Sequence, residues 1–134
     1  MHFHNEESCQ RLFNAIGAES YIPPHRHSLD PKHECLLAVN GLLALIIFDD
    51  LGGIINVTKF GSEIYTQSDD QCVSGVEIPA NIWHTVVSIT PSATLFEVKA
   101  GPFIPEIAKE VAPWAPDELS GEALSYLNFL KGSV

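Results

Sequence analysis

Short runs of apolar residues recur along the first hundred residues, separated at close intervals by turn-forming residues. Runs of this length with such turns predict β-strands. No helix of useful length is predicted between two consecutive strands, which disfavours a parallel sheet with crossover helices. The pattern therefore favours an all-β sandwich or barrel. The expected strands are residues 9–13, 20–27, 34–39, 42–48, 54–60, 72–78, 82–89 and 93–99.

Several turns refine this expectation. Asn40-Gly41 is a strong tight-hairpin signal between the strands on either side of it. The turn residues 49–53 lead into a strand, 54–60, that is expected to pair with the strand before it. Pro23 and Pro24 restrict residues 20–27 to an edge or a barrel rim, because proline cannot donate to a strand ladder. Residues 61–71 are polar and are expected to form a loop.

The remainder of the chain has a different texture. Residues 101–116 are rich in proline and are expected to wrap over a surface. An apolar stripe at helical spacing then predicts a helix over 118–131, ended by Gly132 and packed on the barrel or on a partner subunit. We expect a single domain, 1–134, with a barrel over about 9–100 and an arm and short helix over 101–134. The stripe consists of Leu119, Ala123, Tyr126, Leu127 and Leu130.

Composition and charge exclude several functions. The chain has 134 residues, of which 46% are hydrophobic, enough for one well-buried core. A formal charge of −10 with only 7 Lys and Arg argues against nucleic acid and against an anionic membrane surface as partners. The longest apolar run, 42–48, is too short to span a membrane. No signal peptide is apparent, and three cysteines without a CxxC pair indicate free thiols and a cytoplasmic location.

Histidines provide the candidate chemistry. His25 and His27 stand two residues apart, so in a strand both imidazoles project from one face. Glu34 begins the next expected strand, where Leu36 and Ala38 would share its inward face. A lone carboxylate on an apolar face is costly unless a cation pairs with it. His84, from a distant part of the chain, is a fourth candidate.

These four residue types point to a metal site. Three imidazoles and one carboxylate suit Fe(II), Mn(II), Ni(II), Co(II) or Zn(II) and leave coordination positions open for water or a substrate. We therefore expect one divalent transition metal (Fe, Mn, Ni or Zn), in a site of the catalytic kind. The expected ligands are His25, His27, Glu34 and His84.

The arrangement of these residues resembles the two sequence motifs of the cupins. The first motif is a His-x-His pair followed by a glutamate and, after six further residues, a glycine, here His25, His27, Glu34 and Gly41. The His27-to-Glu34 spacing is two or three residues longer than usual. The second motif matches Pro79 through His84, with Asn81 in place of the turn glycine, and Asn tolerates the left-handed backbone region.

Within the cupins, most of the chain is similar to the small bacterial WbuC-type proteins. The segments that carry this likeness include 10–13, 24–27, 32–34, 77–79, 83–87, 96–103 and the Pro-Trp-Ala-Pro sequence at 113–116. The resemblance implies a double-stranded β-helix (a cupin or jelly-roll barrel) holding a divalent metal. It also suggests a link to polysaccharide biosynthesis, but it implies no particular reaction, because the fold hosts many.

Other residues are weighed against plainer roles. Tyr21 and Glu97 are candidate catalytic groups. Tyr21 would share the inward face of His25 if their strand is regular, and Glu97 would lie beside the metal if the face it shares with Lys99 points inward. His33 is expected to face outward. Trp83 and Trp114 are expected to serve in packing or subunit contacts.

Three functions remain open at this point. The first is a metal-dependent enzyme, isomerase-, epimerase- or dioxygenase-like, acting on a small, possibly carbohydrate-derived substrate. The second is a non-catalytic module that binds or senses a small ligand through the same metal. The third is a metal-free barrel that serves only in assembly. A homodimer is expected, because jelly-roll edges must be covered.

Overall fold

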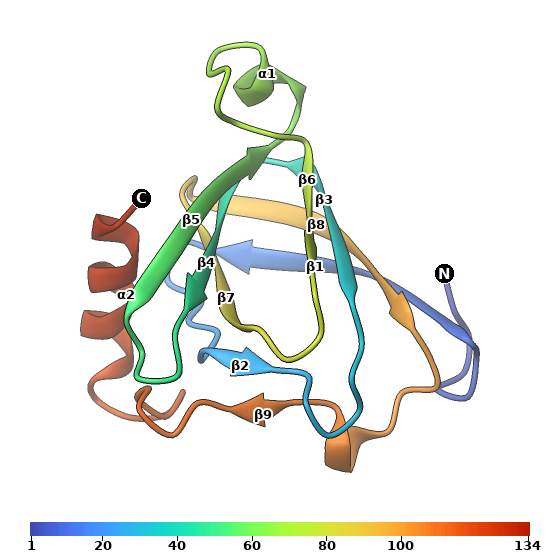
Figure 1. Cartoon of the computed structure of the whole chain (residues 1–134). Helices are drawn as coiled ribbons and strands as arrows, with labels where there is room; N and C mark the ends of the chain where they lie inside the picture. The colour runs from blue at the N-terminus through green and yellow to red at the C-terminus, as the bar shows by residue number, and fades with distance from the viewer.

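The computed structural model describes all residues from 1 to 134, which form two antiparallel sheets with a C-terminal helix beside them (Figure 1). The first sheet has the order β1-β8-β3-β6, formed by Cys9–Gly17, Ser92–Ala100, Glu34–Asn40 and Gly75–Ile78. The second has the order β5-β4-β7-β2-β9, formed by Ile54–Gly61, Leu42–Phe48, Trp83–Ser88, His25–Arg26 and Glu110–Val111. The all-β expectation is confirmed.

The chain has two apolar cores, and the first lies between the two sheets. Side chains from β3 and β8 meet side chains from β4 and β7 inside the barrel, with Leu36, Leu43, Leu45, Val86 and Leu95 among the buried residues. Alternation along each strand places these residues on one face. This inner core forms the apolar side of the candidate site.

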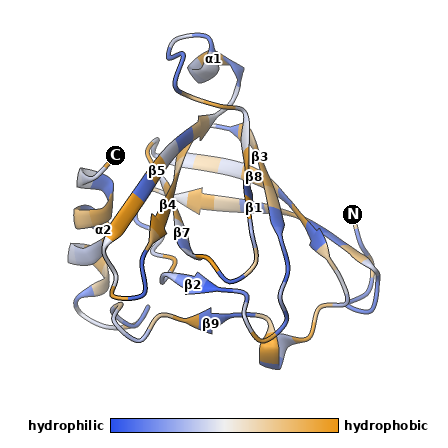
Figure 2. Cartoon of the chain, viewed as in Figure 1, coloured by the Kyte–Doolittle hydropathy of each residue, from blue (hydrophilic) through white to orange (hydrophobic).

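The second core lies on the outer face of the second sheet. The helix α2 (Ala123–Gly132) covers this face, and its buried Leu127 and Leu130 pack with Ala44, Ile46 and Val87. Every residue of β7 is buried as a consequence, because the barrel covers one face of that strand and α2 with the arm covers the other. The predicted helix is therefore present, shorter than 118–131, and it packs on the barrel of its own chain. In Figure 2, β4 is largely hydrophobic, whereas β2 is hydrophilic.

The Asn40-Gly41 hairpin prediction is wrong. β3 pairs with β6 and β8, whereas β4 pairs with β5 and β7, so the two strands lie in different sheets. Gly41 has a φ of +79° and forms the corner between them. An added Cβ there would lie 2.7 Å from Thr90 Oγ1 and 2.8 Å from Ser92 O, so the corner requires glycine.

Other elements differ from the expectation in length. Only His25 and Arg26 of the expected strand 20–27 join a ladder, consistent with the two prolines before them. The expected loop 61–71 contains a one-turn helix, α1 (Glu63–Thr66). The arm contains a 3₁₀ turn (Pro105–Ile107) and also β9, which pairs with β2, so the second sheet extends beyond residue 100. No helix is long and apolar enough to cross a membrane.

Candidate metal centre

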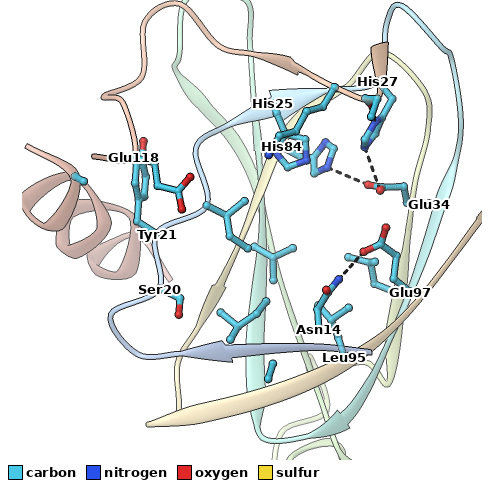
Figure 3. Close-up of a pocket in the computed structure, with 18 of the residues that line it drawn as sticks. Asn14, Ser20, Tyr21, His25, His27, Glu34, His84, Leu95, Glu97 and Glu118 are labelled. Carbon is cyan, nitrogen blue, oxygen red and sulfur yellow. Dashed lines mark hydrogen bonds and ion pairs between the residues drawn. The ribbon is translucent and has the colours of Figure 1, made fainter. Parts of the chain in front are cut away.

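The four predicted ligands meet inside the barrel, although they come from three strands and one loop. Their ligand atoms all lie within 4.8 Å of one another. β2 supplies His25, the residue following β2 is His27, β3 supplies Glu34 and β7 supplies His84. We call His25, His27, Glu34 and His84 the four-residue cluster (Figure 3).

The long His27-to-Glu34 spacing does not displace the glutamate. Glu34 Oε1 lies 3.1 Å from His27 Nε2, and Glu34 Oε2 lies 3.2 Å from His84 Nε2. His25 pairs directly with His84 across the β2–β7 ladder, and their ring centroids are 4.5 Å apart. Glu34, His27 and His84 are buried.

Backbone carbonyl groups fix the orientation of all three imidazoles. The Nδ1 atoms of His25, His27 and His84 lie 2.9, 2.6 and 2.8 Å from the carbonyl oxygens of Pro23, Ala108 and Ile82. A carbonyl only accepts, so each Nδ1 carries the hydrogen and donates it. The neutral imidazole then has a lone pair on Nε2, the atom of His27 and His84 that faces Glu34.

This donor set could hold a cation at its centre. Imidazole lone pairs and carboxylate oxygens repel one another unless a proton or a metal ion lies between them. His27 Nε2 is buried and has no hydrogen bond of acceptable geometry, although Glu34 is close. Metal-ligating histidines are held by a carbonyl at their other nitrogen in this same way. The residues present therefore fit a divalent transition metal.

The pKa values show which groups attract protons in the absence of metal. Burial lowers the pKa of His25 to about 3, and the neighbouring His84 adds to this effect. Burial also opposes charge on His27, but the contact with Glu34 and its negative charge outweigh it and raise the pKa of His27. Burial would raise the pKa of Glu34, yet His27, His84 and Lys99 hold it well below its ordinary value.

Glu97 is buried and lines the same cavity as this cluster, so the condition on which it was a catalytic candidate, an inward-pointing face, is met. Its Oε1 is 2.6 Å from Lys99 Nζ, and its Oε2 accepts a hydrogen bond of 2.6 Å from Asn14 Nδ2. Lys99 Nζ also lies 3.2 Å from Glu34 Oε1, so one ammonium group joins the two carboxylates. Burial opposes the charge of Lys99, but Glu97 and Glu34 outweigh it and raise the pKa of Lys99.

Tyr21 lies in a different part of the cavity. Its hydroxyl donates to the Pro116 carbonyl oxygen at 3.0 Å, and Figure 3 draws it beside Glu118, apart from the four-residue cluster. Burial raises the pKa of the Tyr21 hydroxyl above its ordinary value. Its position favours Glu97 over Tyr21 as the acid–base candidate.

The remaining candidates take plainer positions. His33 faces outward and is exposed, 3.7 Å from Glu77. Trp83 and Trp114 pack edge to face in the outer core, with Arg26 above the Trp83 ring at 4.2 Å. The sequence analysis did not predict the hydrogen bond of Asn14 to Glu97, nor the position of Lys99 between Glu34 and Glu97. The strand register is the signal that would have found Lys99, because it lies directly opposite Glu34.

A cavity of about 960 Å³ opens beside the cluster. Apolar side chains of the inner core form part of its wall, including Ile16, Leu36, Val86 and Leu95. Residues 19–22 and residues of the arm, including Phe103, Lys109 and Glu118, contribute other parts. Its size suits a small organic ligand.

Comparisons with known proteins identify the fold. Residues 1–60 match a family described as a domain of unknown function, DUF6016. No curated protein matches the chain. A cupin-family protein with a double-stranded β-helix fold from Methanocaldococcus jannaschii is similar in structure, with a TM-score of 0.53, 18% identity and coverage of 72% of both chains.

Two sugar-modifying enzymes are also similar in structure. A dTDP-sugar isomerase from Desulfovibrio desulfuricans gives a TM-score of 0.61 at 15% identity, over 90% of this chain and 77% of that one. The sugar 3,4-ketoisomerase QdtA from Thermoanaerobacterium thermosaccharolyticum was solved in complex with TDP. It gives a TM-score of 0.56 at 13% identity, over 75% of this chain and 64% of that one. Other similar solved chains are longer, since this chain spans 50–63% of them. These likenesses establish the cupin fold; the finer WbuC type stays a prediction.

Proposed function

We propose that this chain, which has the cupin fold, is a metal-dependent enzyme acting on a small carbohydrate-derived substrate in the manner of an isomerase or epimerase. The observation that carries the proposal is the set of three carbonyl-oriented imidazoles around one buried carboxylate at the cavity wall. His25, His27, Glu34 and His84 would hold the metal. When bound, it would supply Lewis acidity toward a substrate oxygen.

The chain's own residues suit proton transfer next to a carbonyl group. Such a reaction needs a group that takes a proton and returns it at a neighbouring atom. Glu97 lines the cavity, and Lys99 and Asn14 hold its two oxygens in place. The inner core limits the access of water on one side. The similar structures of two sugar isomerases support this class of reaction.

Metal content tests the first half of the proposal. Mass spectrometry on tag-free protein should find close to one equivalent of Fe, Mn, Ni, Co or Zn. The His25→Ala/His27→Ala double variant should lose it, and Glu34→Ala should retain only part. His33→Ala is the matched control, because it removes an exposed imidazole beside the same strand. Metal that persists in the double variant would refute the site.

Proton exchange tests the second half. In D₂O, the metal-loaded protein should introduce deuterium at the carbon next to the carbonyl of a ketose or aldose, as followed by NMR. Glu97→Gln should lose this exchange and retain the metal. Ligand binding without exchange would favour the non-catalytic binding module, and oxygen consumption without exchange would favour a dioxygenase-like reaction.

A further inference from the structure

Carboxylates outnumber ammonium groups on the wall of the cavity. Apart from histidines and a tyrosine, its ionisable lining residues are four glutamates and two lysines, without an arginine. These residues are Glu19, Glu34, Glu97, Glu118, Lys99 and Lys109. A divalent metal would bring this wall close to neutrality.

The two lysines offer little to an anionic ligand. Lys99 is already paired with two carboxylates, at 2.6 Å from Glu97 and 3.2 Å from Glu34. Lys109 is exposed and pairs with no side chain. A single exposed ammonium group binds an anion weakly in water.

The other cationic side chains are engaged away from the cavity. None of them is part of its lining. Their partners are Glu7 for Arg11, Glu110 for Arg26, Asp30 for Lys32, Asp69 for Lys59 and the Ala18 carbonyl oxygen for Lys131. A phosphate clamp built from this chain would have to break one of these contacts.

Two exposed glutamates add negative charge to the cavity wall away from the metal ligands. Glu19 and Glu118 are both exposed lining residues, and Figure 3 draws Glu118 at a distance from the four-residue cluster. A ligand that reaches from the cluster toward Glu118 would place its far end near that carboxylate, and Glu19 adds a second negative charge to the wall of the same cavity. A diphosphate there would meet like charges, which suppress binding.

We infer that the ligand is an uncharged sugar or related polyhydroxy carbonyl compound that carries neither phosphate nor nucleotide. This inference rests on the proposed function and narrows its substrate class. It separates this chain from the structurally similar ketoisomerase, which was solved with TDP. Hydroxyl and carbonyl oxygens of a neutral ligand would need no counter-charge beyond the metal.

Calorimetric titration with thymidine diphosphate tests the exclusion of anions. Wild type should bind it with a Kd weaker than about 1 mM. The Glu19→Lys/Glu118→Lys variant should bind it about tenfold more tightly, because like charges become complementary. Glu63→Lys/Asp70→Lys changes the net charge equally, at exposed positions outside the cavity, and should match wild type. Wild-type binding tighter than about 1 mM, or equal gains in both variants, would overturn the inference.

The visible spectrum of Co(II)-loaded protein tests the admission of neutral ligands. Glucose, fructose, rhamnose or dihydroxyacetone at about 50 mM should change the spectrum, whereas thymidine diphosphate should not. A spectrum unaffected by every neutral compound would overturn the inference as well. Failure to bind any metal would instead refute the proposed function, while the diphosphate titration would still report on the charge of the cavity.

Discussion

Lys99→Met should destabilise the metal-free protein strongly, because Lys99 is the only ammonium group between two buried carboxylates. The side chains of Lys99, Glu34 and Glu97 are 17%, 7% and 11% exposed. At an effective dielectric of about 20, attraction over 2.6 and 3.2 Å amounts to about 6 and 5 kcal/mol. The cost of desolvating Lys99 offsets much of this attraction. Removing one partner from a buried ion pair of this kind lowers the free energy of unfolding by about 3–5 kcal/mol.

The effect should depend on pH in a defined direction. Lys99 helps to hold the folded-state pKa of Glu34 below its ordinary value of 4.5. The stability that Glu34 contributes is therefore present above pH 4.5 and is lost as the pH falls toward the folded-state pKa. Without Lys99 the depression is smaller, so the cost of the substitution is largest near neutrality and decreases only once the pH falls below the folded-state pKa that Glu34 has in the variant.

Urea unfolding with chelator present, at pH 7 and at about pH 4, measures both quantities. Lys59→Met is the control, because Lys59 also pairs with a carboxylate, Asp69, but at the surface. Its effect should be close to the error of the measurement. If Lys99→Met stays within about 0.5 kcal/mol of wild type at pH 7, or costs more at the lower pH than at pH 7, the expected effect of the buried bridge is refuted.

Four further measurements test the fold and the site. Gly41→Ala should cost about 2–4 kcal/mol in urea unfolding, whereas Gly121→Ala, which meets nothing within 4 Å, should be nearly neutral. Burial lowers the pKa of His25 to about 3, so the free energy of unfolding of the metal-free protein should fall as the pH drops below 6.5. His25→Gln should reduce the slope of this free energy against pH by up to about 1.4 kcal/mol per pH unit. Equal slopes in wild type and variant would contradict this expectation. Saturating metal at about 100 times its Kd should add about 2.7 kcal/mol, an effect that chelation reverses and that thermal unfolding detects. Sedimentation should give a mass of about twice 14.7 kDa, since a homodimer is expected, and a mass near that of one chain would contradict this expectation.

The parts of the fold that follow from local periodicity could be predicted from the sequence. Alternation in β3 correctly placed Glu34 and Leu36 inside and Cys35 outside. The two-residue strands β2 and β9 are too short to show a period, and α1 is a single turn. The Asn40-Gly41 signal reports a tight change of backbone direction, but it does not say which sheet receives the next strand.

The position of Glu34 shows why the sequence spacing was a weaker guide than the ladder. The register of β3 is set by two neighbours, with Glu34 opposite Ile78 of β6 and opposite Lys99 of β8, so the length of the preceding loop does not determine where the carboxylate lies. Directly opposite residues in an antiparallel pair project from the same face. The pairing that brings Glu34 to the imidazoles therefore also brings Lys99 to Glu34. Binding of a divalent metal would make this ammonium group a competitor for the same carboxylate, which is why Lys99→Met should weaken the metal-free protein and strengthen its affinity for metal.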